Sequence, residues 1–147
     1  MRIAFGSDHA GFEPPEPLYK PSIINHLKNR EFEVVDCGPD GPGAVDYPDI
    51  AKTLAEAVLE GRADLGVLLC GTGIGISMGA NRHEGIRAAV CTNAEMVKLA
   101  RAHNNANVLC LGRRVLSLEE AIALVDIFLD TPFSGEERHQ RRVDKLG

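Results

Sequence analysis

Short apolar runs alternate with segments of helical periodicity along the whole chain. Five runs of six residues are mostly apolar, which is typical of strands buried on both faces of a sheet; they cover residues 2–7, 32–37, 65–70, 86–91 and 107–112. The segments between and after them repeat apolar residues every three or four positions, which predicts helices over 20–30, 47–61, 73–82, 94–104 and 116–130. This alternation predicts an α/β fold, a doubly wound (Rossmann-like) three-layer sandwich with an approximately five-stranded parallel sheet.

Two stretches rich in proline or glycine interrupt this pattern. Residues 13–21 contain four prolines and cannot form the interior of a helix, so we expect the first crossover helix to begin near Pro21 or Ser22. Residues 37–48 predict a loop after the second strand. Neither an internal repeat nor a linker divides the chain, and its length suits one core, so residues 1–147 are predicted to form a single domain.

Composition narrows the classes of protein that the chain can belong to. A net charge of −5 and an aromatic content of 5% argue against a nucleic-acid-binding protein. No apolar stretch approaches the roughly 20 residues that cross a bilayer, and no signal peptide is visible, so we expect a cytoplasmic protein without membrane association. The four cysteines lack the spacing of metal ligands, which predicts no metal site. Because no export signal is visible, we expect these cysteines to be reduced thiols and not disulfides.

The candidate chemistry lies where the predicted strands end. In a doubly wound sheet, ligands bind outside the carboxyl ends of the strands. Asp8 and His9 follow the first strand, and Cys70 ends the third strand, directly before a loop with Gly71, Gly73 and Gly75. Glycines let backbone N–H groups approach an anion closely, and the following helix contributes the positive end of its dipole. The loop is therefore predicted to hold an oxyanion or a phosphate.

Cys70 itself has two interpretations. The helix dipole and the free N–H groups stabilise a thiolate, which predicts a base or a nucleophile near neutral pH. Cysteine is also common at buried strand ends, and Cys37, Cys91 and Cys110 are expected to be buried and inert. The adjacent glycine loop favours the reactive interpretation for Cys70. The loop is neither a dinucleotide fingerprint, because its glycines run G-x-G-x-G, nor a cysteine phosphatase loop, because Ile76 stands where arginine is required.

A second group of polar residues is predicted at the opposite edge of the sheet. A crossover helix of about ten residues carries the chain roughly 15 Å back to the amino edge, which places His103 away from Cys70. The C-terminal tail leaves on this same side, and its Arg138, Arg141 and Arg142 predict either a solvated helix or a phosphate clamp. Either these residues serve no site with Cys70, or a second subunit brings them to it in a twofold dimer with two equivalent sites.

Six motifs span nearly the whole chain. In order they are D-H-A-G-F, D-Y-P, C-G-T-G-I-G-I-S, N-R-H-E-G-I-R-A-A-V-C, R-A-H-N-N-A-N-V-L and E-R-H-Q-R-R-V. Together they resemble the family of type B ribose-5-phosphate isomerases, which also contains the galactose-6-phosphate isomerase subunits. The resemblance implies an aldose–ketose isomerase of pentose phosphate metabolism that interconverts ribose 5-phosphate and ribulose 5-phosphate. It also implies that the enzyme needs no metal or organic cofactor. The expected assembly is a homodimer or a dimer of dimers whose active sites are shared between subunits.

The resemblance also implies a role for each matching residue. Cys70 corresponds to the base that moves a proton between C1 and C2 through a cis-enediolate, and His103 to the acid that opens the sugar ring. The Thr72 hydroxyl is placed to bond either the thiolate or the enediolate. The expected substrate contacts are Asp8, His9, Gly71, Gly73, Ile74, Gly75 and Asn104. The expected phosphate ligands are His9, Arg114, Arg138 and Arg142.

One segment departs from the family pattern. Residues 13–21 are longer and richer in proline than in the usual member and lie beside the predicted site, so they are a candidate determinant of which sugar fits. A hexose 6-phosphate, such as allose or galactose 6-phosphate, is the alternative substrate. A non-catalytic phosphosugar-binding protein on the same scaffold predicts loss of the base, the acid or the arginines, all of which are present. One chain carries both Cys70 and His103, which favours a homo-oligomer over unlike subunits.

Overall fold

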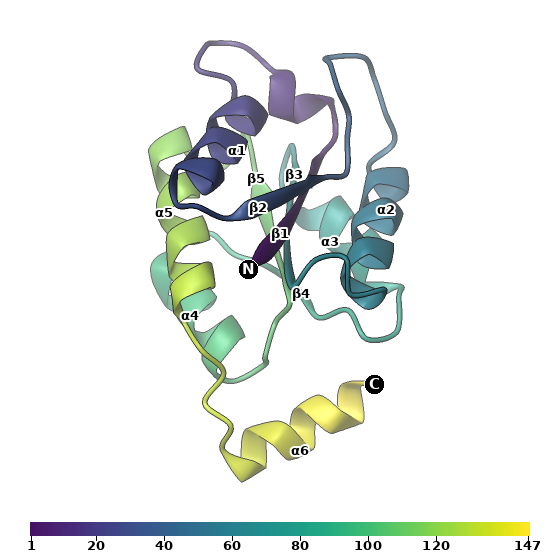
Figure 1. Ribbon diagram of the computed structural model, residues 1–147, viewed down its shortest axis with the longest axis vertical. Coiled ribbons are helices and arrows are strands. Elements are labelled where there is room, and N and C mark those ends of the chain that lie inside the picture. The colour runs from purple at the N-terminus through teal and green to yellow at the C-terminus, as the bar shows by residue number, and fades with distance from the viewer.

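The computed structural model describes residues 1–147 and contains one five-stranded parallel sheet in the order β2-β1-β3-β5-β4 (Figure 1). The strands are β1 (Arg2–Ser7), β2 (Glu33–Asp36), β3 (Leu65–Cys70), β4 (Ala88–Val90) and β5 (Val108–Gly112). The helices are a short 3-10 turn η1 (His9–Phe12), α1 (Tyr19–Asn29), α2 (Tyr47–Leu59), α3 (Ile74–Asn81), α4 (Ala94–Ala102), α5 (Leu118–Asp130) and α6 (Glu137–Leu146). The predicted doubly wound α/β fold is confirmed.

Helices cover both faces of the sheet, which explains why its central strands β3 and β5 carry no charged residue and are almost entirely buried. Successive side chains of a strand point to opposite faces, so Ile3 and Phe5 pack with α1, α4 and α5, whereas Ala4 packs with α2 and α3. In β3 the same alternation directs Leu69 to the first of these clusters and Cys70 to the second. The Cys70 side chain therefore faces the layer formed by α2 and α3.

The candidate ligand edge lies where β1 and β3 end side by side. The chain moves outward from β1 to β2 and then crosses to β3 on the other side, which makes this pair the topological switch point. Ser7 pairs with Leu69, and the Asp8 N–H donates to the Leu69 carbonyl at 3.1 Å. Asp8 is thereby placed next to Cys70 at the carboxyl edge.

Helix α1 begins at Tyr19, so the expected start near Pro21 or Ser22 is wrong. Pro21 lies within the first turn, where N–H groups have no partner inside the helix and proline removes no hydrogen bond. The buried Tyr19 hydroxyl donates to the Leu116 carbonyl at 2.6 Å. This contact with a residue far along the chain holds Tyr19 at the head of the helix.

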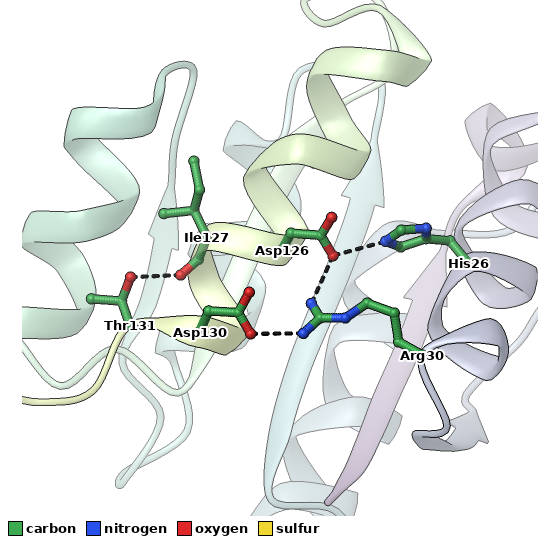
Figure 2. Close-up of polar contacts among 6 residues, drawn as sticks. All are labelled: His26, Arg30, Asp126, Ile127, Asp130 and Thr131. Carbon is green, nitrogen blue, oxygen red and sulfur yellow. Dashed lines mark hydrogen bonds and ion pairs between the residues drawn. The ribbon is translucent and has the colours of Figure 1, made fainter.

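A charged network connects α1 to α5 on one face of the sheet (Figure 2). Asp126 accepts from His26 at 2.7 Å and from Arg30 at 2.8 Å, and Arg30 also reaches Asp130 at 2.7 Å. Hydrogen bonds to Asp130 and Asp126 raise the pKa of Arg30. The Thr131 hydroxyl donates to the Ile127 carbonyl at 2.6 Å and closes the last turn of α5. The network is structural, because it lies along the helix pair and not at the carboxyl edge.

Helix α6 extends beyond the sheet, at the end of the molecule opposite η1 (Figure 1). Only His139 and Val143 of this helix are buried, so most of its surface faces solvent. The longest helices, α2 and α5, have 13 residues, and none is long and apolar enough to span a bilayer.

Candidate active site

Cys70 lies at the end of β3 with its thiol directed at the start of α3. Its side chain is buried, and its Sγ accepts the Gly73 N–H at 3.1 Å. Gly73 is the N-cap of α3 and has a φ of 82°, a left-handed conformation that strongly favours glycine. The predicted juxtaposition of a thiol, a glycine loop and a helix N-terminus is therefore present.

The loop after Cys70 is held against the loop after β5. The Arg113 N–H donates to the Cys70 carbonyl at 2.8 Å, and the Arg114 N–H donates to the Gly71 carbonyl at 2.9 Å. A Cβ at Gly112 would lie only 2.6 Å from the Thr72 carbonyl oxygen, so the two backbones touch here. These contacts fix the path of the glycine loop independently of any ligand.

The Thr72 hydroxyl accepts the Ile74 N–H at 3.2 Å, which leaves its own proton free to donate. Ile74 itself is half exposed, and the ring of Tyr47 packs over Gly75, since a Cβ at Gly75 would lie 2.8 Å from it. The exposed Thr72 and Ile74 therefore border the loop, and the Tyr47 ring lies beside Gly75.

Asp8 and His9 lie at the same edge as Cys70. Asp8 is buried and caps η1 by accepting the Ala10 N–H at 2.8 Å, whereas the His9 side chain is exposed. Asp8 has one fixed orientation, and His9 is free to reach a ligand.

Arg114 completes this group. Its guanidinium packs on Gly71, where a Cβ would lie 2.9 Å from one of its terminal nitrogens. A hydrogen bond to Glu13 raises the pKa of Arg114, and the nearby charges of Asp8 and Cys70 raise it further. The structure thus brings Cys70, the glycine loop, Asp8, His9 and Arg114 together at the carboxyl edge.

The other predicted site residues gather at the amino edge. His103 follows α4, and its ring stacks on the ring of His139 with centroids 4.1 Å apart. Burial, followed by the charges of His103 and Arg138, lowers the pKa of His139. Arg138 bonds Glu136 at 3.0 Å, and Arg142 is exposed on the same helix.

Asn104 lines a hollow of about 440 Å³ beside His103. Leu146 of α6 and Arg87 at the start of β4 also border this hollow. One chain therefore carries two groups of candidate residues at opposite edges of the sheet and does not bring His103, Asn104 and Arg142 to Cys70.

The three remaining cysteines are buried free thiols. Burial raises the pKa of Cys37 and of Cys91 to about 11, and it raises the pKa of Cys110 well above its ordinary value. The inert interpretation of these three thiols agrees with their environments. No group of three or more His, Cys, Asp or Glu side chains is arranged to hold a metal ion.

Sequence reasoning missed two residues at the carboxyl edge, Glu13 and Tyr47. Glu13 stands in the proline-rich segment and bonds Arg114, which lies 101 residues away in the sequence. No local pattern signals such a contact. Tyr47 belongs to the D-Y-P motif, and its position at the start of a predicted helix gave no indication that its ring packs on Gly75.

Comparison with known proteins places the chain in a family. The family model described as Ribose/Galactose Isomerase matches residues 3–146. Ribose-5-phosphate isomerase B of Escherichia coli is 45% identical over 99% of this chain and 93% of its own. The solved structure of Clostridium thermocellum ribose-5-phosphate isomerase B covers 100% of this chain and 95% of its own, with 48% identity and a TM-score of 0.94.

A second solved structure carries a ligand. Ribose-5-phosphate isomerase B from Mycoplasma genitalium, with bound ribulose-5-phosphate, is 45% identical, covers 99% of this chain and 93% of its own, and has a TM-score of 0.90. The family match, the near-complete coverage and the shared fold agree with one another. The chain therefore belongs to the ribose/galactose isomerase family and is an isomerase.

Proposed function

We propose that the protein is an aldose–ketose isomerase that interconverts D-ribose 5-phosphate and D-ribulose 5-phosphate. The observation that carries this proposal is the Cys70 thiol, which accepts the Gly73 N–H at the head of α3, directly before the glycine loop. A thiolate is favoured in such a position. Relatives with the same fold bear the corresponding name, and the one from Mycoplasma genitalium holds ribulose-5-phosphate.

In this proposal Cys70 acts as the base. Its thiolate removes the proton from C2 of the open-chain aldose, the C–H electrons form the C1–C2 double bond, and the negative charge moves to the oxygen on C1. The O2 hydroxyl then passes its proton to the oxygen on C1, the C2 carbonyl forms, and return of the proton from Cys70 to C1 yields the ketose. A positioned base contributes roughly 10²- to 10⁴-fold, and each preorganised donor to the enediolate oxygen about 10²- to 10³-fold. N–H groups of the loop between Gly71 and Gly75 and the Thr72 hydroxyl are the proposed donors.

His103 is the proposed acid that protonates the ring oxygen and opens the sugar. Because His103 lies at the amino edge, a second copy of the chain has to supply it to Cys70. Arg138 and Arg142 lie on α6 of the same copy as His103, so they reach the phosphate from the second copy. His9 and Arg114 reach it from the first copy, which supplies Cys70. Asn104, beside His103, contacts the sugar. The proposed assembly is a homodimer with two equivalent shared sites, alone or paired into a dimer of dimers.

The surface around β4 supports such a dimer. β4 is an edge strand whose residues are only partly buried, and α3 packs against it. Ile74 and Met78 of α3 are 50% and 65% exposed. Met96 and Leu99 of α4 are each 41% exposed. Apolar side chains gathered beside an unpaired strand are typical of an interface between subunits.

A hexose 6-phosphate is the second candidate substrate. The observation that favours it is the proline-rich segment, whose Glu13 contacts Arg114 at the proposed phosphate end of the site. A segment that reaches this position alters the space available to the sugar.

The decisive experiment compares turnover of ribose 5-phosphate, allose 6-phosphate and galactose 6-phosphate by the purified protein and by Cys70→Ala. We expect ribulose 5-phosphate formation that the substitution reduces by at least about 10²-fold. Turnover of a hexose phosphate alone would identify a hexose 6-phosphate as the substrate in place of ribose 5-phosphate. Full activity in Cys70→Ala would contradict the proposed role of Cys70 as the base.

A further inference from the structure

The carboxylate of Glu13 engages Arg114 at two points. Glu13 Oε1 accepts from Arg114 Nε at 3.3 Å, and Oε2 accepts from a terminal nitrogen at 3.0 Å. A guanidinium presents the same pair of N–H groups to a phosphate. Without a ligand, Glu13 therefore occupies the donors that a phosphate group would use.

The position of Arg114 makes this contact relevant to the site. Its guanidinium packs on Gly71, the first residue after Cys70. Asp8 and Cys70 are near enough for their charges to raise the pKa of Arg114. Glu13 thus engages the N–H donors of Arg114, the cation that lies beside the loop after Cys70.

The segment that carries Glu13 is held by contacts that do not involve its carboxylate. A terminal nitrogen of Arg113 donates to the Glu13 carbonyl at 3.3 Å and to the Pro14 carbonyl at 3.2 Å. The Arg113 guanidinium also lies 4.2 Å from the centre of the Tyr19 ring, and Tyr19 is tied to Leu116. Removal of the Glu13 charge alone should therefore leave the segment in place.

Exposure and charge allow a ligand to displace the carboxylate. The Glu13 and Arg114 side chains are 32% and 59% exposed, so the pair is only partly shielded from water. The hydrogen bond from Arg114 lowers the pKa of Glu13, so its carboxylate remains charged at neutral pH. An exposed pair of this kind changes an equilibrium constant by a factor of about two to five.

We propose that Glu13 is a built-in competitor of the substrate phosphate at Arg114, and that it weakens phosphosugar binding without taking part in the proton transfer. This inference rests on the proposed function, in which Arg114 is a phosphate ligand. The carboxylate must leave Arg114 before the phosphate binds, so breaking the ion pair offsets part of the binding free energy of the phosphate. Because this effect is confined to the phosphate end, it acts on KM and not on kcat.

The test compares wild-type protein with Glu13→Gln, using Glu16→Gln as the matched control in the same segment. Glu16 is exposed, and no hydrogen bond or ion pair of its side chain is present. Steady-state kinetics with ribose 5-phosphate gives kcat and KM, and calorimetric titration with inorganic phosphate gives its Kd. Glu13→Gln should lower both KM and the phosphate Kd by about two- to fivefold with kcat unchanged, and Glu16→Gln should match wild type.

Further substitutions separate the two proposals. Arg114→Ala should weaken phosphate binding, and Glu13→Gln should have no added effect in that background. Unchanged or weaker phosphate binding in Glu13→Gln would overturn the competitor role, as would unchanged phosphate binding in Arg114→Ala. Absence of ribose 5-phosphate turnover would instead contradict the proposed reaction, while the phosphate titrations would still decide the role of Glu13.

Discussion

The imidazole rings of His103 and His139 stack with centroids 4.1 Å apart and an interplanar angle of 12°. This stack joins the end of α4 to α6, and the Ser134 N–H, which donates to the Ala102 carbonyl at 3.0 Å, adds a second connection. The C-terminal helix is therefore anchored at the residue proposed as the ring-opening acid. His139 fixes the plane of the His103 ring and brings Arg138 and Arg142 next to it.

The stack predicts a dependence of stability on pH. Burial lowers the pKa of His139 below its ordinary value of 6.5. As the pH falls below about 6.5 the unfolded chain binds a proton that the folded chain does not, so the free energy of unfolding decreases until the lowered pKa is passed. His139→Phe keeps a stacking ring and removes this proton site.

Urea denaturation of both proteins at pH 7.5 and 5.5 provides the measurement. We expect wild type to lose more stability between these values than His139→Phe. The groups that face His139, namely His103, Arg138, Glu136 and Arg142, are present in both proteins, so the difference between the two losses reports His139 together with its interaction with His103. An identical loss of unfolding free energy in the two proteins would contradict the assignment of this pH dependence to His139.

The separation of Cys70 from His103 predicts complementation between inactive subunits. Cys70→Ala and His103→Asn should each be nearly inactive as homodimers, because every site lacks either its base or its acid. When equal amounts exchange subunits, half of the dimers become mixed and each contains one intact site. Activity should then recover to about a quarter of wild type.

The control mixes Cys70→Ala with Cys70→Ser, both altered at the same position. This mixture should show no recovery, since no combination restores an intact site. Turnover of ribose 5-phosphate after mild denaturation and refolding of the mixtures gives the measurement. Failure of the first mixture to recover, with mixed dimers shown by mass spectrometry, would mean that the sites are not shared.

Local pattern and topology revealed much of the fold and part of the site. Strands with both faces buried are apolar in every position, so the run at residues 65–70 identified β3 with its bounds. The glycine loop after Cys70 could be recognised because three glycines follow the cysteine at every second position. The placement of His103 at the opposite edge followed from the direction of a crossover helix.

Contacts between distant residues could not be predicted in this way. The start of α1 depends on the Tyr19 hydroxyl, whose partner Leu116 is 97 residues away. The contact between Glu13 and Arg114 likewise forms only when the chain has folded. Proline content indicated that the segment was no helix interior, but it carried no information about what the segment touches.

The close approach of two backbones predicts that Gly112 does not tolerate a side chain. In Gly112→Ala the new Cβ would lie 2.6 Å from the Thr72 carbonyl oxygen, and backbone cannot move aside as a flexible side chain can. We expect a loss of about 1–3 kcal/mol in the free energy of unfolding and a lower kcat, because the loop after Cys70 shifts. Gly43→Ala is the control, since nothing lies within 4 Å of its Cβ. Equal stability of the two variants would contradict the close packing.

The four thiols should differ sharply in their reaction with iodoacetamide at pH 7.5. Burial raises the pKa of Cys37 and of Cys91 to about 11 and raises the pKa of Cys110 well above its ordinary value, so these thiols stay protonated and unreactive. Cys70 instead lies at the head of α3, where its Sγ accepts the Gly73 N–H at 3.1 Å. Peptide mass spectrometry should therefore find the first label on Cys70, with loss of activity in parallel and protection by ribose 5-phosphate.

Cys70→Ala should take up no label over the same time. A label that appears first on another cysteine, or that leaves turnover intact, would contradict the base assigned to this site.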